Sequence, residues 1–144
     1  MSQNDILGIL SPAQIDDLQR RARTAAANAY APYSRFRVGA AILLRDGNIV
    51  TGCNVENASY RLTTCAEQAA ISSAVAAYGP SIRIHAIVIV NLNEAASHPC
   101  GACRQTIREF ASADTEVFYS TAHGSLTRST IDDLLPQAFV LEER

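Results

Sequence analysis

The sequence predicts an α/β domain in which helices cover a mixed β-sheet. Three observations lead to this prediction: a helical pattern opens the chain, a β-hairpin pattern follows it, and helices then alternate with strands. Alternation of this kind is typical of parallel neighbours in a sheet, and the hairpin adds an antiparallel pair. With 144 residues, 48% hydrophobic and 18% charged, the chain has the size and composition of one domain, which we expect over residues 1–144.

The first two elements have clear local signals. Ser11, Pro12 and Gln14 form a capping pattern with proline at the first helical position, and apolar residues continue at helical spacing to about Tyr30. Apolar alternation on both sides of an Asp-Gly turn signal then predicts a β-hairpin over residues 36–53.

The second half of the chain predicts alternating helices and strands. An alanine-rich segment begins at Thr64 and is bounded by Gly79-Pro80, which predicts a helix. The β-branched run Ile82–Val90 is typical of a buried central strand. The pattern then predicts a helix from Pro99 to about Phe110, a strand over Glu116–Tyr119 and a helix near Ile131–Leu135.

Composition and the first residues limit the cellular compartments and the partners that we expect. A formal net charge of −2 lacks the basic footprint of nucleic-acid binding, so we expect no such partner. The first residues have neither the cationic start nor the apolar run of a signal peptide, and no stretch reaches the roughly 18 apolar residues of a membrane span. We therefore expect a cytoplasmic protein without a membrane partner. Its four cysteines then favour metal binding or catalysis over disulfides.

Three of the cysteines lie where two helices are predicted to begin. Cys65 opens one helix, and the Cys-x-x-Cys pair Cys100 and Cys103 opens another. Backbone N–H groups and the positive end of a helix stabilise thiolates, which are ligands for zinc. Three protein ligands leave the fourth position of a tetrahedral zinc ion to water, as in catalytic sites. We expect one zinc ion per chain.

Glu67 lies two residues after Cys65, within reach of a water beside the metal. Zinc chemistry on water needs a carboxylate that takes and delivers a proton, so Glu67 is the candidate proton shuttle. The alternative interpretation is structural, because Thr64-x-x-Glu67 also matches a capping box.

The cysteine and glutamate spacing matches a known signature. Cys65-Ala66-Glu67 followed by Pro99-Cys100-Gly101-Ala102-Cys103 fits the three-cysteine form of the zinc deaminase motif. Over about residues 20–140 the chain resembles the small homotetrameric cytidine deaminases. The other segments that carry this resemblance are Tyr30–Phe36, Val38–Ala41, Asn54–Ala58 and Leu134–Pro136.

This resemblance implies a three-layer α/β/α fold with about five strands, and a homotetramer whose subunits share active sites. The implied reaction is hydrolytic deamination of free cytidine and 2′-deoxycytidine to uridine and 2′-deoxyuridine plus ammonia, by attack of zinc-activated water at C4. Cys65, Cys100 and Cys103 resemble the zinc ligands and Glu67 the general acid/base. The implied substrate contacts are Phe36 beside the base, Asn54 and Glu56 at the ribose 3′-hydroxyl, the backbone of Ala66 and Cys100 at the pyrimidine edge, and Tyr60 and Phe139, which family members contribute across subunit interfaces.

Several alternatives stay open at this point. A modified cytosine nucleoside, as in antibiotic resistance, is a second possible substrate, although a site built for a free ribose hydroxyl disfavours it. His98 as a fourth ligand would close the site and make a structural zinc module. Cys100 and Cys103 as a redox pair, and editing of a polynucleotide, fit the sequence less well; an anionic Glu56 near the sugar also disfavours phosphate. Cys53 is interpreted as a small buried residue outside the zinc site.

The chain departs from the resembled family after the catalytic glutamate, where Gln68 stands in place of a common arginine. Zinc with three thiolates has a formal charge of −1, so the missing cation leaves water at the metal harder to ionise, and Arg104 offsets this only in part. We predict that Gln68→Arg moves the acidic limb of the kcat/KM pH profile to lower pH. A pH–rate series on both proteins measures this, and an unchanged or raised limb would contradict the prediction.

Overall fold

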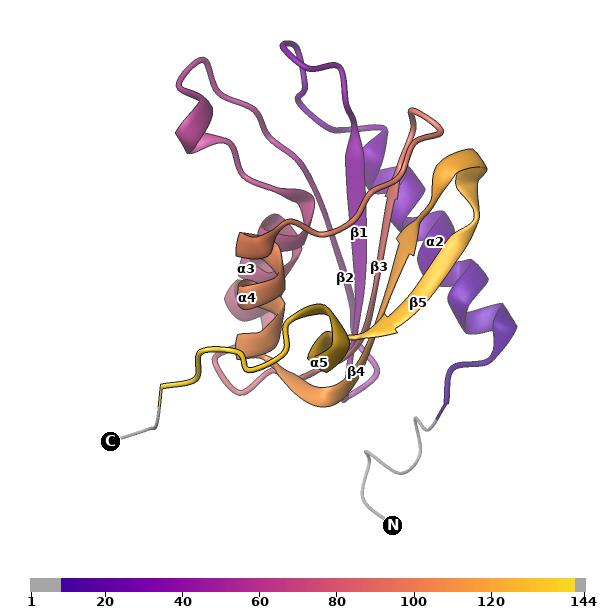
Figure 1. Ribbon diagram of the computed structural model, residues 1–144, viewed down its shortest axis with the longest axis vertical. Coiled ribbons are helices and arrows are strands. Elements are labelled where there is room, and N and C mark those ends of the chain that lie inside the picture. Colours follow the sequence, from indigo (N-terminus) through magenta and orange to yellow (C-terminus); the bar gives the residue numbers. More distant parts are fainter. Residues whose placement is uncertain (1–8, 142–144) are drawn as a thin grey trace.

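The computed structural model describes residues 9–141, and a five-stranded mixed sheet forms its centre (Figure 1). The strands are β1 (Val38–Leu44), β2 (Ile49–Cys53), β3 (Ile84–Asn91), β4 (Ala111–Ser120) and β5 (Leu126–Thr130). Their order is β2-β1-β3-β4-β5, with β3 and β4 parallel and the other neighbours antiparallel. The predicted mixed sheet is confirmed; residues 1–8 and 142–144 of the expected domain lie outside the described residues.

Helices cover both faces of this sheet. They are α2 (Pro12–Ala26), α3 (Ala66–Tyr78), α4 (Gly101–Glu109) and α5 (Ile131–Leu134), with short 3₁₀ turns at Tyr60–Leu62 and Ala122–Gly124. Helix α2 packs on one face, against β1, β2 and β3, whereas α3, α4 and α5 lie on the other face (Figure 1). The result is the expected three-layer arrangement.

The alternation of side chains along the strands separates two cores. Ile42, Ile87 and Ile89 point toward α3 and α4, while their neighbours Ala41 and Val88 point toward α2. Strand β3 is buried along its whole length and contributes apolar side chains to both cores, as expected of a strand that is covered on each face. The prediction of a buried central strand from its β-branched run is therefore confirmed.

Two glycines bring helices close to the sheet. A Cβ atom on Gly39 would lie 1.9 Å from the carbonyl oxygen of Ala22 in α2, and one on Gly52 would lie 2.4 Å from the backbone nitrogen of Ala70 in α3. Both contacts are with backbone, which cannot move aside as a flexible side chain can. The close approach at Gly52 thus sets the position of α3, the helix that carries Glu67.

Gly52→Ala is expected to lower the free energy of unfolding by about 2 kcal/mol, because overpacking against backbone forces α3 away from β2. Chemical denaturation followed by circular dichroism measures the change. Gly101→Ala is the matched control, since a Cβ there meets no atom within 4 Å. Equal stability of the Gly52 and Gly101 variants would contradict this account of the packing.

Two departures from the predicted elements come from long-range backbone pairing. Helix α2 ends at Ala26 and not near Tyr30, because Tyr30 donates its N–H to the Asn54 carbonyl at 3.1 Å and accepts from the Glu56 N–H at 2.8 Å. Strand β5 was not predicted: its residues are mostly polar and it owes its form to antiparallel pairing with β4. Within residues 9–141, no helix is long and apolar enough to cross a membrane.

Candidate active site

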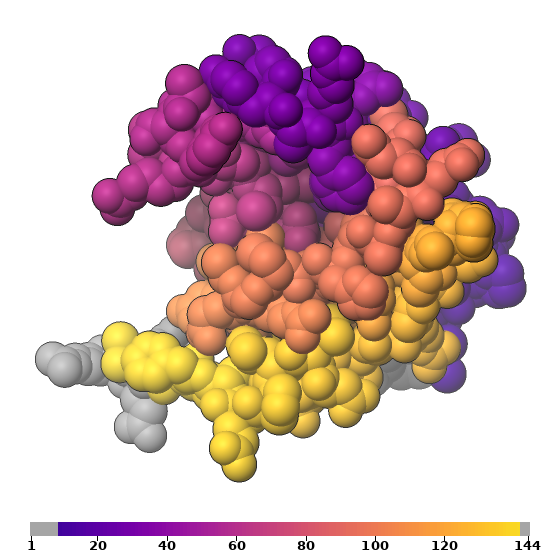
Figure 2. Space-filling view, turned by 45° about the horizontal axis from the view of Figure 1, so that its top comes forward, coloured from indigo at the N-terminus to yellow at the C-terminus, as the bar shows by residue number. Residues whose placement is uncertain are grey.

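A cavity of about 300 Å³ opens at the end of the sheet where β1 begins and β2 and β3 end. Figure 2 shows the recess between a projecting arm, residues 57–63, and the residues that begin α4. Thirteen residues line it: Ser34, Phe36, Val38, Asn54, Glu56, Thr63, Cys65, Ala66, Glu67, Ile89, Ser97, His98 and Cys100. Segments distant in sequence therefore meet around one space.

The three predicted zinc ligands converge at this cavity. Cys65 is the N-cap of α3 and Cys100 is the N-cap of α4, while Cys103 lies buried in the first turn of α4. Their sulfur atoms all lie within 4.8 Å of one another. With Zn–S bonds of about 2.3 Å, thiolates at this spacing can hold one ion, and the adjoining cavity leaves room for water and a ligand. The residues present therefore fit one zinc ion per chain.

The proximity of the thiol groups shifts the pKa values of Cys65 and Cys103. The Cys103 thiol hydrogen-bonds to Cys65 and lowers the pKa of Cys65 to about 7, against the opposing effect of burial. The same interaction, together with burial, raises the pKa of Cys103. One negative charge is thus already favoured in the metal-free cluster, at a helix N-terminus that stabilises it.

Glu67 is buried beside the cysteines, with only 5% of its surface exposed. Burial raises the pKa of its carboxyl group, and hydrogen bonds with its own backbone N–H and with the Cys103 thiol oppose that shift. The structure also argues against the capping alternative, because Gln68 accepts the Cys65 N–H through Oε1 at 3.4 Å. Gln68 thus takes the capping position, and Glu67 remains at the cavity wall.

Arg104 lies in α4 immediately after Cys103. Its guanidinium group donates to the carbonyl oxygens of Pro99, at 2.8 Å, and of Leu134, at 2.9 Å. These bonds tie the residue before Cys100 to the end of α5. Arg104 therefore braces the loop that carries the cysteines.

The predicted substrate-binding residues divide into two groups. Phe36, Asn54, Glu56 and Ala66 line the same cavity as Cys65, Glu67 and Cys100. Tyr60, on the arm, and Phe139, near the C-terminus, do not line it; they are 76% and 70% exposed. Phe139 is nevertheless held near α4, since its carbonyl accepts from the Gln105 side chain at 2.9 Å.

The remaining candidates lie outside the ligand cluster. Among residues 9–141 the group of converging ligand atoms comprises three cysteines, without Cys53 or His98. His98 lines the cavity, and its ring packs on Tyr119 with centroids 4.7 Å apart. No fourth protein ligand closes the site within this group, which favours a catalytic over a structural metal centre.

The sequence assigns no role to five of the lining residues, Ser34, Val38, Thr63, Ile89 and Ser97, and suggests His98 only as a metal ligand. Thr63, Ile89 and Ser97 follow from tertiary packing and have no local signal. Ser34 and Val38 are different, because they lie in Tyr30–Phe36 and Val38–Ala41, two of the segments that carry the family resemblance.

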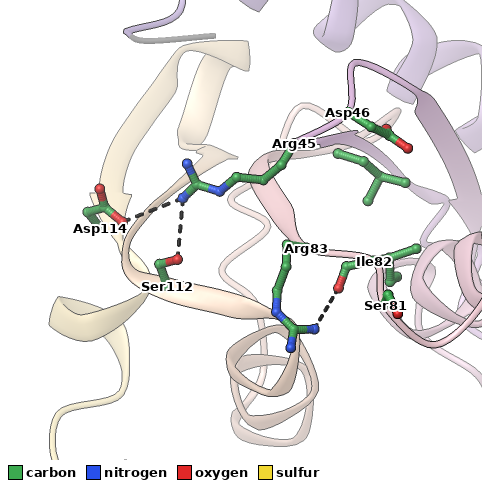
Figure 3. Close-up of a pocket in the computed structure, with 8 residues that line it drawn as sticks. Arg45, Asp46, Ser81, Ile82, Arg83, Ser112 and Asp114 are labelled. Carbon is green, nitrogen blue, oxygen red and sulfur yellow. Dashed lines mark hydrogen bonds and ion pairs between the residues drawn. The ribbon is translucent and has the colours of Figure 1, made fainter. Parts of the chain in front are cut away.

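A second recess, of about 520 Å³, lies at the opposite end of the sheet (Figure 3). Arg45 is 3.4 Å from the Ser112 hydroxyl and 3.6 Å from the Asp114 carboxylate, and Arg83 donates to the Ile82 carbonyl at 2.8 Å. The arginines of this recess thus have partners within the protein, and the three cysteines lie at the other end of the sheet. We place the chemistry in the smaller cavity.

The fold and the cysteine site define a class of protein, the zinc-dependent deaminases with a three-layer α/β/α fold. Comparison with known families agrees: the model of the cytidine and deoxycytidylate deaminase zinc-binding region matches residues 12–121. The chain belongs to this family.

Individual relatives point the same way. The chain is 44% identical over 127 residues to the cytidine deaminase of Halalkalibacterium halodurans, covering 88% of this chain and 94% of that protein. The crystal structure of cytidine deaminase from Mycobacterium tuberculosis matches with a TM-score of 0.77 at 42% identity, covering 88% and 97% of the two chains. That from Burkholderia pseudomallei matches with a TM-score of 0.79 at 45% identity, covering 86% and 98%. A blasticidin-S deaminase from Bacillus cereus is 32% identical over 109 residues, covering 72% and 76%.

Proposed function

We propose that this protein hydrolyses cytidine and 2′-deoxycytidine to uridine and 2′-deoxyuridine, releasing ammonia. One observation carries the proposal: a buried carboxyl group, Glu67, lies beside three converging thiols at the wall of a cavity large enough for a small ligand. Family membership and the named relatives give the substrate class.

Cys65, Cys100 and Cys103 hold the metal in this proposal. Bound zinc supplies Lewis-acid assistance that brings the pKa of water to about 7. Glu67 takes a proton from the attacking water and delivers it to N3 of the pyrimidine. It then takes the proton of the new C4 hydroxyl group and delivers it to the departing amine. A C4–O bond forms and the C4–N bond breaks, so that water and cytidine give uridine and ammonia. Burial suits Glu67 to proton transfer, because it raises the pKa of the carboxyl group, which then holds a proton more readily between the two transfers.

Residues around the same cavity recognise the nucleoside. Asn54 and Glu56 bind the ribose 3′-hydroxyl, Phe36 packs beside the base, and backbone groups of Ala66 and Cys100 bind the pyrimidine edge. All five residues line the cavity. A carboxylate at the sugar repels a 3′-phosphate, so the substrate is a free nucleoside and not a polynucleotide. The formal net charge of −2 supports the same conclusion.

The first test follows the ultraviolet absorbance of cytidine after addition of purified, zinc-loaded protein. Conversion to uridine supports the proposal. Stoichiometric zinc without turnover of either cytidine or 2′-deoxycytidine would contradict it. Blasticidin S is included as a second substrate, because of the Bacillus cereus relative; turnover of blasticidin S alone would favour the modified-nucleoside alternative.

We further propose a single-domain subunit in a cytoplasmic homotetramer, in which Tyr60 and Phe139 complete neighbouring active sites. Both side chains are exposed, as are Leu62, Val140 and Leu141, so apolar side chains face outward on both the arm and the C-terminal segment. Exposed apolar patches of this kind mark interaction sites. A cytoplasmic location suits the zinc ligands, because thiols stay reduced there.

Subunit mixing tests the shared sites. Glu67→Gln and Phe139→Ala homotetramers are each expected to be nearly inactive. Refolded together, they are expected to regain about a quarter of wild-type activity or less, because some sites then combine an intact Glu67 with an intact neighbouring Phe139. Size-exclusion chromatography with light scattering establishes the assembly. A monomer, or no recovery in mixed tetramers, would contradict the proposal.

A further inference from the structure

The Glu56 side chain is held by the turn that precedes β1. Its Oε1 accepts the backbone N–H groups of Tyr33, at 2.9 Å, and of Ser34, at 3.1 Å. Its Oε2 accepts the hydroxyl proton of Ser34 in a short hydrogen bond. The backbone is fixed to the same turn, since the Glu56 N–H donates to the Tyr30 carbonyl at 2.8 Å. These bonds thus fix the orientation of the Glu56 carboxylate.

These bonds leave little hydrogen-bonding capacity for a ligand. A carboxylate offers about four acceptor sites, and three on Glu56 are taken, so one remains on Oε2. Asn54 is partly committed too: it donates to the Phe36 carbonyl at 2.8 Å and accepts from the Val38 N–H at 2.9 Å, which leaves one N–H and one lone pair on Oδ1. The remaining Glu56 acceptor site beside the remaining Asn54 N–H matches a single hydroxyl group, which donates once and also accepts.

Ser34 determines which acceptor site stays free. A hydroxyl has one proton, and that of Ser34 goes to Glu56, while its oxygen accepts the Phe36 N–H at 3.0 Å. Ser34 therefore joins the aromatic wall of the cavity to the carboxylate at its sugar end. Ser34 itself lines the same cavity.

We infer that Ser34 is a positioning residue for ribose recognition, whose hydroxyl turns the Glu56 carboxylate so that its one free acceptor site meets the 3′-hydroxyl of the nucleoside. This inference rests on the proposed function, and in particular on the binding of that hydroxyl by Asn54 and Glu56. Ser34 does not touch the reacting atoms; it acts through Glu56.

Two further observations support this role. The pKa of Glu56 lies below its ordinary value, chiefly because the Ser34 hydroxyl donates to it, so the group stays an anionic acceptor at neutral pH. Arg35, next in the turn, has φ of 59°, in the left-handed region that costs a residue with a side chain about 1 kcal/mol or more. Its N–H binds the Ala31 carbonyl at 2.9 Å, and its carbonyl accepts from the Asn93 side chain at 3.0 Å. The turn is thus held in a strained shape around the carboxylate.

The test compares Ser34→Ala with wild type on two nucleosides, cytidine and 3′-deoxycytidine, which differ only in the 3′-hydroxyl. For cytidine, kcat/KM is expected to fall about tenfold or more, mainly through KM, as for loss of one hydrogen bond to a charged group. For 3′-deoxycytidine, kcat/KM is expected to stay within about twofold of wild type, because the hydroxyl that Glu56 would meet is absent.

Two variants serve as controls. Ser34→Thr retains a hydroxyl and is expected to restore much of the selectivity for cytidine. Ser112→Ala removes a serine at the opposite end of the sheet and is expected to change neither substrate. Circular dichroism and zinc content are compared for all variants, so that misfolding is recognised.

Each other outcome overturns the inference. Equal losses on both nucleosides would show a merely structural role for Ser34, and no loss on either would show that Glu56 is oriented without it. A wild-type enzyme that treats the two nucleosides alike would remove the premise that the 3′-hydroxyl is bound, although deamination would still stand. Failure of wild type to convert cytidine at all would instead refute the proposed function.

Discussion

Glu67→Gln is expected to lower kcat for cytidine about 10³-fold, because glutamine has the shape of the carboxyl group but cannot transfer a proton. Zinc content is expected to remain at one ion per chain, since Glu67 is not among the converging ligand atoms. Initial rates by ultraviolet absorbance and metal analysis by atomic absorption measure the two effects.

Glu109→Gln is the matched control for this substitution, because Glu109 is exposed on α4 and away from the cavity. Its kcat is expected to equal that of wild type. Substantial activity in zinc-loaded Glu67→Gln would show that another group transfers the proton. Loss of zinc from that variant would show that Glu67 acts on the metal site and not on the substrate.

The same substitution is expected to stabilise the zinc-free protein at pH values above the ordinary pKa of a carboxyl group. Burial raises the pKa of Glu67, so the folded protein loses stability as the pH rises from that ordinary value through the raised one. Glutamine removes this cost, so the gain in the free energy of unfolding is largest at high pH and vanishes at low pH, where Glu67 is protonated. Urea unfolding of both proteins at several pH values, with a chelator present, measures the difference.

Cys103→Ser is expected to weaken zinc affinity more than about 100-fold, which exceeds the loss typical of residues that only support a ligand. Serine is a poor zinc ligand at neutral pH, and among the described residues only Cys65 and Cys100 offer ligand atoms beside the buried Cys103, so no other side chain there replaces it. Turnover of cytidine is expected to be lost with the metal. Competition with a chromophoric chelator gives the affinity.

Wild-type zinc affinity is also expected to fall as the pH drops, and to fall more steeply below about 7, the pKa to which Cys65 is lowered, because one further proton then competes for that thiolate. Cys53→Ser is the matched control, since this cysteine is half-buried at the end of β2 and outside the cluster. Undiminished zinc binding by Cys103→Ser, or equal losses in the two variants, would refute the assigned ligand set.

The zinc site could be predicted from the sequence because its signals are local. Cys100 and Cys103 are three residues apart, and Cys65 and Glu67 lie within one turn of a helix whose alanine-rich pattern is clear. A helix brings such residues to one end whatever the rest of the fold does. That these two helix starts meet depends on the sheet, and the expectation that they do came from the resemblance to a family.

The misassigned elements depend on partners distant in sequence. The alanines near residues 25–29 continue a helical pattern, yet the chain leaves the helix because the Tyr30 backbone pairs with residues 54–56. The residues of β5 show no apolar alternation that would predict a strand. They form one because their backbone hydrogen-bonds to β4. Local propensity was overridden in both cases by long-range pairing.

The sequence by itself determined the α/β class, the capping of the first helix, and the choice of three cysteines as candidate zinc ligands and of Glu67 as candidate proton shuttle, because each of these depends on residue type and short spacing. Only the tertiary structure decided that Glu56 is held by the turn at Tyr33 and Ser34, and that Gln68 and not Glu67 caps α3. The physical reason is the same for both. A hydrogen bond forms where the folded chain brings a donor within reach of an acceptor, and the spacing of two residues along the sequence does not give the distance between their side chains.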